Sequence, residues 1–336
     1  MISATRANEL IAAIQGKRVL VVGDLMLDRY VYGSVSRISP EAPVPVVHVM
    51  NDDAVPGGAA NVASNIQALG GQAAIAGLVG SDPSAGELRD LLEGQGIQTA
   101  GVLGCDALHT SVKTRIIAER QQVVRFDREG SPAEVARHTG PLCERLDALI
   151  AEADGVIVED YGKGVLEDDV VQRIMDVAIR KGIPVAYDPK DDHPLAISGL
   201  ALATPNFKEA CVAAGESPFE PLVDPDTDPR LARAAAVLLE KWSPALLAIT
   251  LGSHGMYLCS CIAEPVLLPT RAREVFDVSG AGDTVIAATF LGLLAGGDPI
   301  EAASLANHAA GIVCAKMGTA PCTRAELSTA FEVIHD

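Results

Sequence analysis

The stretch "DVSGAGDT", residues 277–284, places small residues between two aspartates, directly before the apolar run "TVIAATFLGLLAGG" at 284–297. The apolar run predicts a helix, and the first N–H groups of a helix have no carbonyl partners within it. These groups also carry the positive end of the helix dipole, and glycine leaves them accessible to a phosphate oxygen. The sequence therefore predicts an anion site formed by the amides of Gly280, Ala281 and Gly282.

Asp283 follows these small residues in the first turn of the predicted helix. A carboxylate at that position can take a proton from an attacking hydroxyl while the amides hold a transferring phosphoryl group. A simpler interpretation also exists, because an acidic side chain at a helix N-terminus is favourable for electrostatic reasons alone. On this stretch by itself, both interpretations stay open.

The chain has 336 residues and a formal net charge of −18, and 49% of its residues are hydrophobic. This composition is typical of an α/β protein that buries strands between helices. The acidic excess argues against general binding of nucleic acid or of a membrane surface, since their phosphates would be repelled. No apolar run approaches the roughly 20 residues of a membrane span, and the N-terminus lacks the apolar core of a signal peptide. We therefore expect a cytoplasmic protein with no nucleic-acid or membrane partner.

Short β-branched segments alternate with helical patterns along most of the chain. This alternation predicts an α/β fold with a doubly wound, mostly parallel central sheet. We expect a single domain over residues 1–336. The predicted strands cover 17–24, 73–80, 155–160, 183–189, 201–206 and 246–252. The clearest predicted helices cover 58–71, 84–96, 167–182, 229–242 and 284–297.

Two segments, at about 29–50 and 109–127, interrupt this alternation with strand-like sequence rich in Val, Ile and Arg. They are predicted to pair into a second, smaller sheet. The prolines at 40, 43 and 45 fit a connection or an edge strand, because proline cannot donate a hydrogen bond to an interior ladder. Such a sheet could cover a site as a lid or could join two subunits, and the sequence allows both.

A second glycine motif opens a predicted helix in "PGGAANVASNIQALGG", residues 56–71. Gly57 and Gly58 would let a ligand approach the backbone, and Asn61 could offer its amide to a sugar hydroxyl. Taken alone, a Gly-Gly pair at a helix start usually reflects close packing. Neither the P-loop pattern GxxxxGK[ST] nor the zinc pattern HExxH occurs in the chain, so two common ways of handling phosphate or activating water are missing.

The order and separation of the two glycine motifs resemble those of the ribokinase-like, or PfkB-type, sugar kinases. That family carries a GG-x-x-x-N opening near the N-terminus and a D-x-x-G-A-G-D signature near the C-terminus, and the resemblance spans nearly the whole chain. It implies a ribokinase-like fold and transfer of a phosphoryl group from ATP to a sugar hydroxyl. In this resemblance Asp283 is the catalytic base, and the amides of residues 280–282 form the anion hole.

The resemblance also implies magnesium. The family's N-x-x-E element, which organises Mg²⁺ and the nucleotide phosphates, matches Asn206 and Glu209 in "TPNFKEA". Oxygen ligands that act partly through water suit this hard ion. Asp277 matches a family position near the metal or a monovalent cation such as K⁺. Val278 replaces the threonine often found beside it, which leaves the cation preference open.

The nucleotide is expected in the C-terminal half of the chain. The segment "ITLGSHGMYL", residues 249–258, resembles the family's T-x-G-x-x-G strand and turn. This similarity implies that Thr250, Gly252 and Gly255 lie beside ATP. Asn307 matches the position where the family packs the adenine.

The segment "GDLMLDRYVYGSVSRISPEAPVPVV", residues 23–47, indicates which sugar the chain would phosphorylate. It resembles the family members that phosphorylate the anomeric (C1) hydroxyl of D-glycero-β-D-manno-heptose 7-phosphate. That resemblance implies the 1,7-bisphosphate as product and a role in ADP-heptose and lipopolysaccharide core biosynthesis. In some relatives this kinase is fused to a nucleotidyltransferase, and 336 residues are expected to hold the kinase alone.

A sugar phosphate requires cationic side chains, which an acidic protein must cluster locally. Arg37, Lys163 and Lys190 are preferred, because each adjoins a turn or a predicted strand end; for each, an ordinary solvated charge is the alternative. Asp24 and Asp28, at the end of the first predicted strand, are candidates for hydrogen-bonding to sugar hydroxyls. For Asp28 the alternative is a salt bridge to the second sheet. Further candidates for the phosphate are Lys113, Arg115 and Arg120.

Two other functions fit the same fold: a kinase for another phosphosugar, such as fructose phosphate, and a non-catalytic sugar or nucleotide sensor. A base beside an anion hole argues against the sensor, which has no use for a base. A Rossmann dehydrogenase is disfavoured, because "GGAAN" lacks the GxGxxG spacing. The expected partners are a sugar phosphate and ATP, together with a second copy of the chain, since the family often dimerises through its small sheet.

Overall fold

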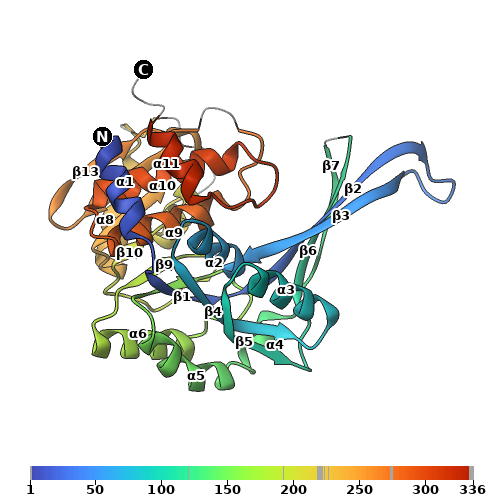
Figure 1. Ribbon diagram of the computed structural model, residues 1–336, viewed down its shortest axis with the longest axis horizontal. Helices are drawn as coiled ribbons and strands as arrows, with labels where there is room; N and C mark the ends of the chain where they lie inside the picture. The colour runs from blue at the N-terminus through green and yellow to red at the C-terminus, as the bar shows by residue number, and fades with distance from the viewer. Residues whose placement is uncertain are drawn as a thin grey trace.

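The computed structural model describes residues 2–119, 121–191, 193–217, 222, 224–225, 227–272 and 275–332. Two sheets organise these residues, and helices cover both faces of the larger one (Figure 1). Within the described residues, no helix is both long and apolar enough to cross a membrane.

The main sheet has, within the described chain, nine strands in the order β13-β12-β11-β10-β9-β8-β1-β4-β5. The strands from β11 to β5 run parallel, whereas β12 and β13 form an antiparallel edge. The predicted doubly wound, mostly parallel sheet is therefore confirmed. The strands are β1 (Arg18–Gly23), β4 (Gln72–Gly80), β5 (Gln98–Cys105), β8 (Gly155–Glu159), β9 (Val185–Asp188), β10 (Leu202–Ala203), β11 (Leu246–Thr250), β12 (Met256–Ser260) and β13 (Ala263–Leu268).

The sequence pattern was most informative for the strands in the middle of this sheet. Strands β1 and β8 are buried on both faces and are continuous apolar runs, as parallel strands require. The pattern predicted no strand at β5, β12 or β13, which lie at or near the two sheet edges and include exposed or partly exposed positions. At the edges, periodicity is a weaker signal.

Helices pack on both faces of the main sheet. One face carries α1 (Ala4–Ala13), α2 (Ala59–Ala68), α3 (Pro83–Gly94), α9 (Ala281–Leu294), α10 (Pro299–Cys314) and α11 (Arg324–Glu332). The other carries α5 (Gly140–Ala151), α6 (Asp168–Lys181), α7 (Phe207–Ala213) and α8 (Pro229–Trp242), while α4 (Pro132–Ala136) buries none of its residues. The five predicted helices correspond to α2, α3, α6, α8 and α9.

The second sheet, here called the small sheet, projects from the body as a long arm (Figure 1). Its order is β3-β2-β6-β7, and its strands are β2 (Leu25–Ile38), β3 (Pro45–Gly58), β6 (Ser111–Ala118) and β7 (Gln121–Arg128). The predicted pairing of these two segments is therefore confirmed. Pro40 and Pro43 lie in the connection at the end of the arm, and Pro45 begins β3. Strand β2 follows β1 after one residue, and β3 leads directly into α2, so the two sheets meet near the first glycine motif.

Candidate functional site

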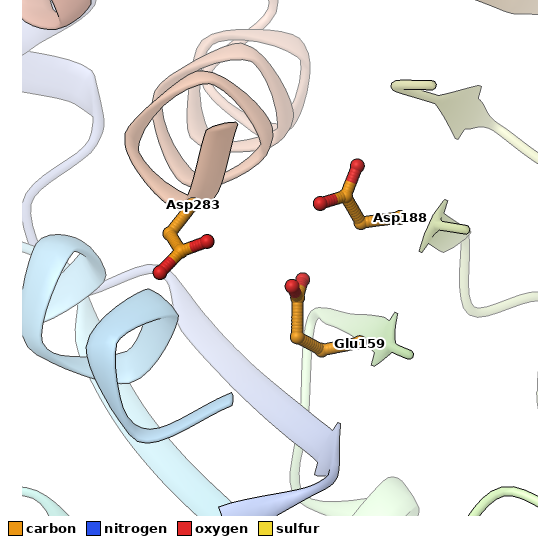
Figure 2. A group of neighbouring side chains, drawn as sticks. All are labelled: Glu159, Asp188 and Asp283. Carbon is orange, nitrogen blue, oxygen red and sulfur yellow. The ribbon is translucent and has the colours of Figure 1, made fainter. Parts of the chain in front are cut away.

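The carboxyl ends of β1, β8 and β9 lie side by side, and acidic residues gather there. Glu159 is the last residue of β8, and Asp188 is the last residue of β9. Figure 2 shows their carboxylates pointing toward Asp283, which comes from the first turn of α9. Ligands of doubly wound sheets bind at the carboxyl ends of the strands. The candidate site therefore lies where the start of α9 faces this edge.

Two hydrogen bonds orient the carboxylate of Asp283. The amide Nδ2 of Asn61 donates to Oδ2 at 2.6 Å, and the hydroxyl of Tyr161 donates to Oδ1 at 2.8 Å. Asp283 is only 6% exposed, and this burial raises the pKa of its carboxyl group, while the two hydrogen bonds oppose the rise. A carboxylate that is held in place and only partly stabilised as an anion has the properties of a general base.

The amides before Asp283 are arranged to receive an anion. Gly280 directly precedes α9 with φ +76°, and no side chain caps the helix. A methyl group at Gly280 would stand 2.6 Å from Nδ2 of Asn61, so a side chain there would disturb the contact that orients the base. The N–H of Ala281 bonds to the carbonyl of Val278, whereas no hydrogen bond to a described residue is present for the N–H of Gly282. The free N–H of Gly282 at the helix start suits a phosphoryl oxygen.

Three carboxylates form an acidic cluster: one oxygen from each of Glu159, Asp188 and Asp283, all within 4.8 Å of one another. Glu159 is fully buried, and neither of its carboxylate oxygens has a hydrogen-bond partner among the described residues. Burial, with the charge of Asp188 as the next cause, raises the pKa of Glu159 well above its ordinary value; burial likewise raises that of Asp188. Unpartnered buried oxygens of this kind fit an oxygen-preferring cation such as Mg²⁺.

Asn206 and Glu209 lie next to this cluster and form a capping box at the start of α7. The Asn206 side chain accepts from the N–H of Glu209, and the Glu209 side chain accepts from the N–H of Asn206. Burial raises the pKa of Glu209 to about 7, and the charge of Glu209 contributes to the raised pKa of Asp188. The structure thus gives both residues a local role and places the Glu209 carboxylate within electrostatic reach of the acidic cluster.

Asp277 lies outside the acidic cluster. Its carboxylate accepts hydrogen bonds from the N–H groups of Ser279 and Gly318, at 2.9 and 3.1 Å. These bonds lower the pKa of Asp277 despite its partial burial. Asp277 thereby holds the turn that leads into α9 against the segment near residue 318.

The nucleotide residues predicted from the sequence share one cavity, with a volume of about 330 Å³. Thr250, Gly252, Gly255 and Asn307 line it. Ala281 and Gly282 line the same cavity, so it opens onto the anion site at the start of α9. Its wall is mostly apolar, as a site for a flat aromatic base requires.

Asn307 shapes this cavity rather than pointing a free amide into it. Its Nδ2 donates to the carbonyl of Pro269 at 2.7 Å, and its Oδ1 accepts from the N–H of Arg271 at 3.3 Å. These contacts fix the segment that forms part of the cavity wall. The role of Asn307 toward a base would therefore be exerted largely through packing.

Asp24 is buried, and its carboxylate accepts hydrogen bonds from backbone N–H groups. It accepts from the N–H groups of Tyr161, Lys163 and Val165, at 3.0, 3.0 and 3.2 Å. Burial raises the pKa of Asp24, and these hydrogen bonds oppose that rise. These three hydrogen bonds therefore hold the loop after β8 in place.

Asp28, in β2, forms a buried ion pair with the second predicted segment of the small sheet, as one of its two sequence interpretations proposed. Its Oδ1 accepts from Nη1 of Arg115, in β6, at 2.7 Å. A methyl group added at Gly57 would come within 2.7 Å of Oδ2 of Asp28. Gly57 is thus required for close approach of β3 to β2. Gly58 has φ +57° and directly precedes α2, which carries Asn61.

The cationic candidates occupy different places. Lys163 pairs with Glu129 beside the site, and Lys190 lies 3.7 Å from an oxygen of Asp191. Lys113 is half-buried and stands over the ring of Tyr161. Arg37 is exposed near the far end of β2. Arg120 lies outside the described residues.

The sequence analysis missed three residues of the site: Tyr161, Glu159 and Asp188. The available signal was their position, because each lies at or just after the carboxyl end of a predicted strand, within "VED", "DYGKG" or "YDPK". Acidic residues at the ends of neighbouring parallel strands converge at one sheet edge. Which strands are neighbours is a tertiary property, and the sequence alone did not supply it.

Comparison with known proteins agrees with this geometry. Residues 17–326 match the pfkB family of carbohydrate kinases. The bifunctional protein HldE of Azorhizobium caulinodans is 43% identical over 325 residues, which cover 96% of this chain and 66% of that protein. HldE of Halorhodospira halophila is 45% identical over 318 residues, covering 94% and 63%. The chain thus spans slightly less than two thirds of the length of these relatives.

Solved structures show the same fold at low identity. Ribokinase of Arabidopsis thaliana, complexed with ribose and ATP, has a TM-score of 0.74 at 19% identity and covers 95% of this chain and 99% of its own. Phosphofructokinase-2 of Escherichia coli, in complex with substrates and products, has a TM-score of 0.75 at 18% identity and covers 95% and 100%. The fold is therefore ribokinase-like, and by its family match the chain belongs to the pfkB family of carbohydrate kinases.

Proposed function

We propose that this chain uses ATP to phosphorylate the anomeric (C1) hydroxyl of D-glycero-β-D-manno-heptose 7-phosphate, giving the 1,7-bisphosphate. The reaction would serve ADP-heptose and lipopolysaccharide core biosynthesis in the cytoplasm. The observation that carries the proposal is the position of Asp283, held by Asn61 and Tyr161 beside an anion site and a cavity of about 330 Å³. The segment 23–47 and the identity to HldE proteins support the heptose.

In the proposed reaction Asp283 takes the proton from the anomeric hydroxyl. The sugar oxygen forms a bond to the γ-phosphorus while the bond from that phosphorus to the ADP oxygen breaks, with the three atoms in line. The amides of residues 280–282 stabilise the charge on the transferring phosphoryl group. The base and the anion site lie on the same helix turn, so one rigid element positions both.

Magnesium is proposed at the acidic cluster, with Glu159 and Asp188 facing it and Asn206 and Glu209 acting through water. Bound there, the ion would neutralise the nucleotide phosphates. The convergence of three carboxylates, with both oxygens of the buried Glu159 unpartnered among the described residues, supports this position. A monovalent cation such as K⁺ is proposed near Asp277, on the other side of the same turn.

The phosphate of the sugar is proposed to bind Lys163 and Lys190, which lie in the loops after β8 and β9. Arg37 lies nine positions beyond Asp28 in β2, about 30 Å of extended strand. Arg37 would therefore reach a sugar phosphate in the site of a second copy rather than in its own. Asp24 is proposed to act on the sugar indirectly, through the loop that it fastens.

A homodimer through the small sheet is also proposed. This sheet exposes large apolar side chains along its arm, among them Ile38, Val49, Met50 and Phe126, between 53% and 68% exposed. Apolar groups gathered on a projecting sheet are typical of an interaction surface. A second copy would cover them and place the ends of the two arms near the opposite bodies.

The decisive experiment is a coupled assay of ADP release with MgATP and four acceptors: D-glycero-D-manno-heptose 7-phosphate, fructose 6-phosphate, ribose and adenosine. The proposal predicts the highest kcat/KM for the heptose phosphate, and phosphorus NMR of the product would identify the C1 phosphate. Preference for fructose 6-phosphate would support the kinase activity and contradict heptose phosphate as the substrate. Absence of turnover with every acceptor would favour a sensor on the same fold.

A further inference from the structure

Tyr161 lies in the loop that follows β8 and is fixed at both ends. Its backbone N–H donates to Oδ2 of Asp24 at 3.0 Å, and its side-chain hydroxyl donates to Oδ1 of Asp283 at 2.8 Å. Asp24 directly follows β1, so the backbone of the loop is anchored to the main sheet. The ring of Tyr161 therefore spans the distance between this anchor and the base.

The same loop contacts the small sheet. The ammonium group of Lys113, in β6, stands 5.2 Å from the centre of the Tyr161 ring, a cation–π geometry. No ion pair of Lys113 is present among the described residues, and the Tyr161 ring provides a stabilising contact for its ammonium group. Two residues beyond Tyr161, Lys163 pairs with Glu129, which follows β7. The first contact joins the loop to β6 of the small sheet, and the second joins it to the residue that follows β7.

We infer that Tyr161 is a positioning residue that orients Asp283 and links the base to the small sheet through Lys113. This inference rests on the proposed kinase function and adds to it a residue and a route by which the small sheet would affect the chemical step. The donor from Asn61 fixes one carboxylate oxygen and the donor from Tyr161 fixes the other, which together set the plane of the carboxylate. Each oxygen keeps a second lone pair for the sugar hydroxyl.

A different role for Tyr161 would give the opposite kinetic result. If its hydroxyl occupied the place of the sugar hydroxyl, the substrate would displace it, and its removal would lower the KM for the sugar without lowering kcat. A positioning residue instead acts on the geometry of the reacting groups, so its loss lowers kcat. The two roles can be separated by a single substitution.

Tyr161→Phe removes the hydroxyl and keeps the ring under Lys113. We expect kcat to fall by about 10- to 100-fold, with the KM for ATP unchanged. Tyr257→Phe is the matched control, because Tyr257 lies in β12 and packs with the cluster on the opposite face of the main sheet; it should retain wild-type kcat. A kcat within twofold of wild type for Tyr161→Phe, or a lower KM for the sugar, would overturn the inference.

A second measurement does not depend on turnover, so it remains informative if no sugar is phosphorylated. The chain has five tyrosines, and labelling them with ¹³C at Cζ gives five signals, of which Tyr161→Phe identifies one. The Tyr161 signal should shift in Asp283→Asn, which changes its hydrogen-bond acceptor, and in Lys113→Met, which removes the cation over the ring. The Tyr257 signal should stay unchanged in both. If the Tyr161 signal is unchanged in both variants, the proposed link between Asp283 and Lys113 through Tyr161 is excluded.

Discussion

The side-chain amide of Asn61, the third residue of α2, donates a 2.6 Å hydrogen bond to the carboxylate of Asp283, the third residue of α9. The two residues are 222 positions apart, and each follows one of the two glycine motifs. Helices α2 and α9 pack against each other, so their first turns lie together. The two motifs at opposite ends of the chain therefore build one site, in which the first helps to orient the base provided by the second.

Asp283→Asn should remove the base while keeping the size of the side chain. We expect kcat to fall by about 10²- to 10⁴-fold, because the anomeric hydroxyl would lose its proton acceptor. The affinity for ATP should change little, since the nucleotide cavity is intact. Steady-state kinetics gives the first quantity and calorimetric titration with ATP the second. Substantial retained turnover would remove Asp283 from the role of base.

Gly280→Ala and Gly282→Ala should separate stability from chemistry. At Gly280 the left-handed backbone and the 2.6 Å approach to Asn61 predict a loss of at least about 1–2 kcal/mol in the free energy of unfolding. At Gly282 no atom lies within 4 Å of an added methyl, so the fold should keep its stability or gain up to about 1 kcal/mol. That methyl would nevertheless stand at the anion site and lower kcat. Urea unfolding and steady-state kinetics on both variants test this contrast; equal losses of stability would contradict it.

Arg115→Met should leave the Asp28 carboxylate buried without its cation. The side chains of this pair are 14% and 6% exposed, and loss of one partner of a buried pair costs about 3–5 kcal/mol. The double variant with Asp28→Asn should recover most of that loss, because no charge stays buried. Arg18→Ala is the control: its pair with Asp154 is exposed, so at most about 1 kcal/mol is expected. Additive losses in the double variant would show that the two side chains do not interact.

Glu159→Gln tests the acidic cluster through its dependence on pH and metal. Burial raises the pKa of Glu159 well above its ordinary value, so the folded protein binds this proton more tightly than the unfolded chain does. The contribution of Glu159 to stability is then fully present below the unfolded pKa and is lost as the pH rises toward the folded pKa. Without metal, the uncharged glutamine should therefore raise the melting temperature at about pH 8 and change it little near pH 4.

Mg²⁺ provides the second half of the same experiment. In the wild type the ion should raise the melting temperature more at about pH 8 than at about pH 5, since it competes with protons for the same oxygens. In Glu159→Gln this stabilisation should be much smaller. Glu41→Gln, in the exposed connection between β2 and β3, is the matched control and should behave as wild type. An undiminished Mg²⁺ effect in Glu159→Gln would place the ion elsewhere.

Features that depend only on neighbouring residues could be predicted from the sequence. Glycines before an apolar run predicted the starts of α2 and α9, because backbone freedom and unpaired N–H groups are local properties. Continuous apolar runs predicted the central strands, since parallel strands are buried on both faces. The four residues expected beside the nucleotide came from the family resemblance; two of them, Gly252 and Gly255, lie in the turn after β11.

Which of the acidic residues act together depends on how the elements pack in three dimensions. Asp24 and Asp28 both follow the first strand, yet one fastens the loop at Tyr161 and the other pairs with Arg115. Glu159 and Asp188 join Asp283 because β8 and β9 are adjacent in the sheet and α9 begins opposite their ends. Strand order and helix packing are set by burial of the whole apolar surface, a sum over residues far apart in the chain. No short segment of sequence carries this information, so the partners of each carboxylate could be identified only in the folded structure.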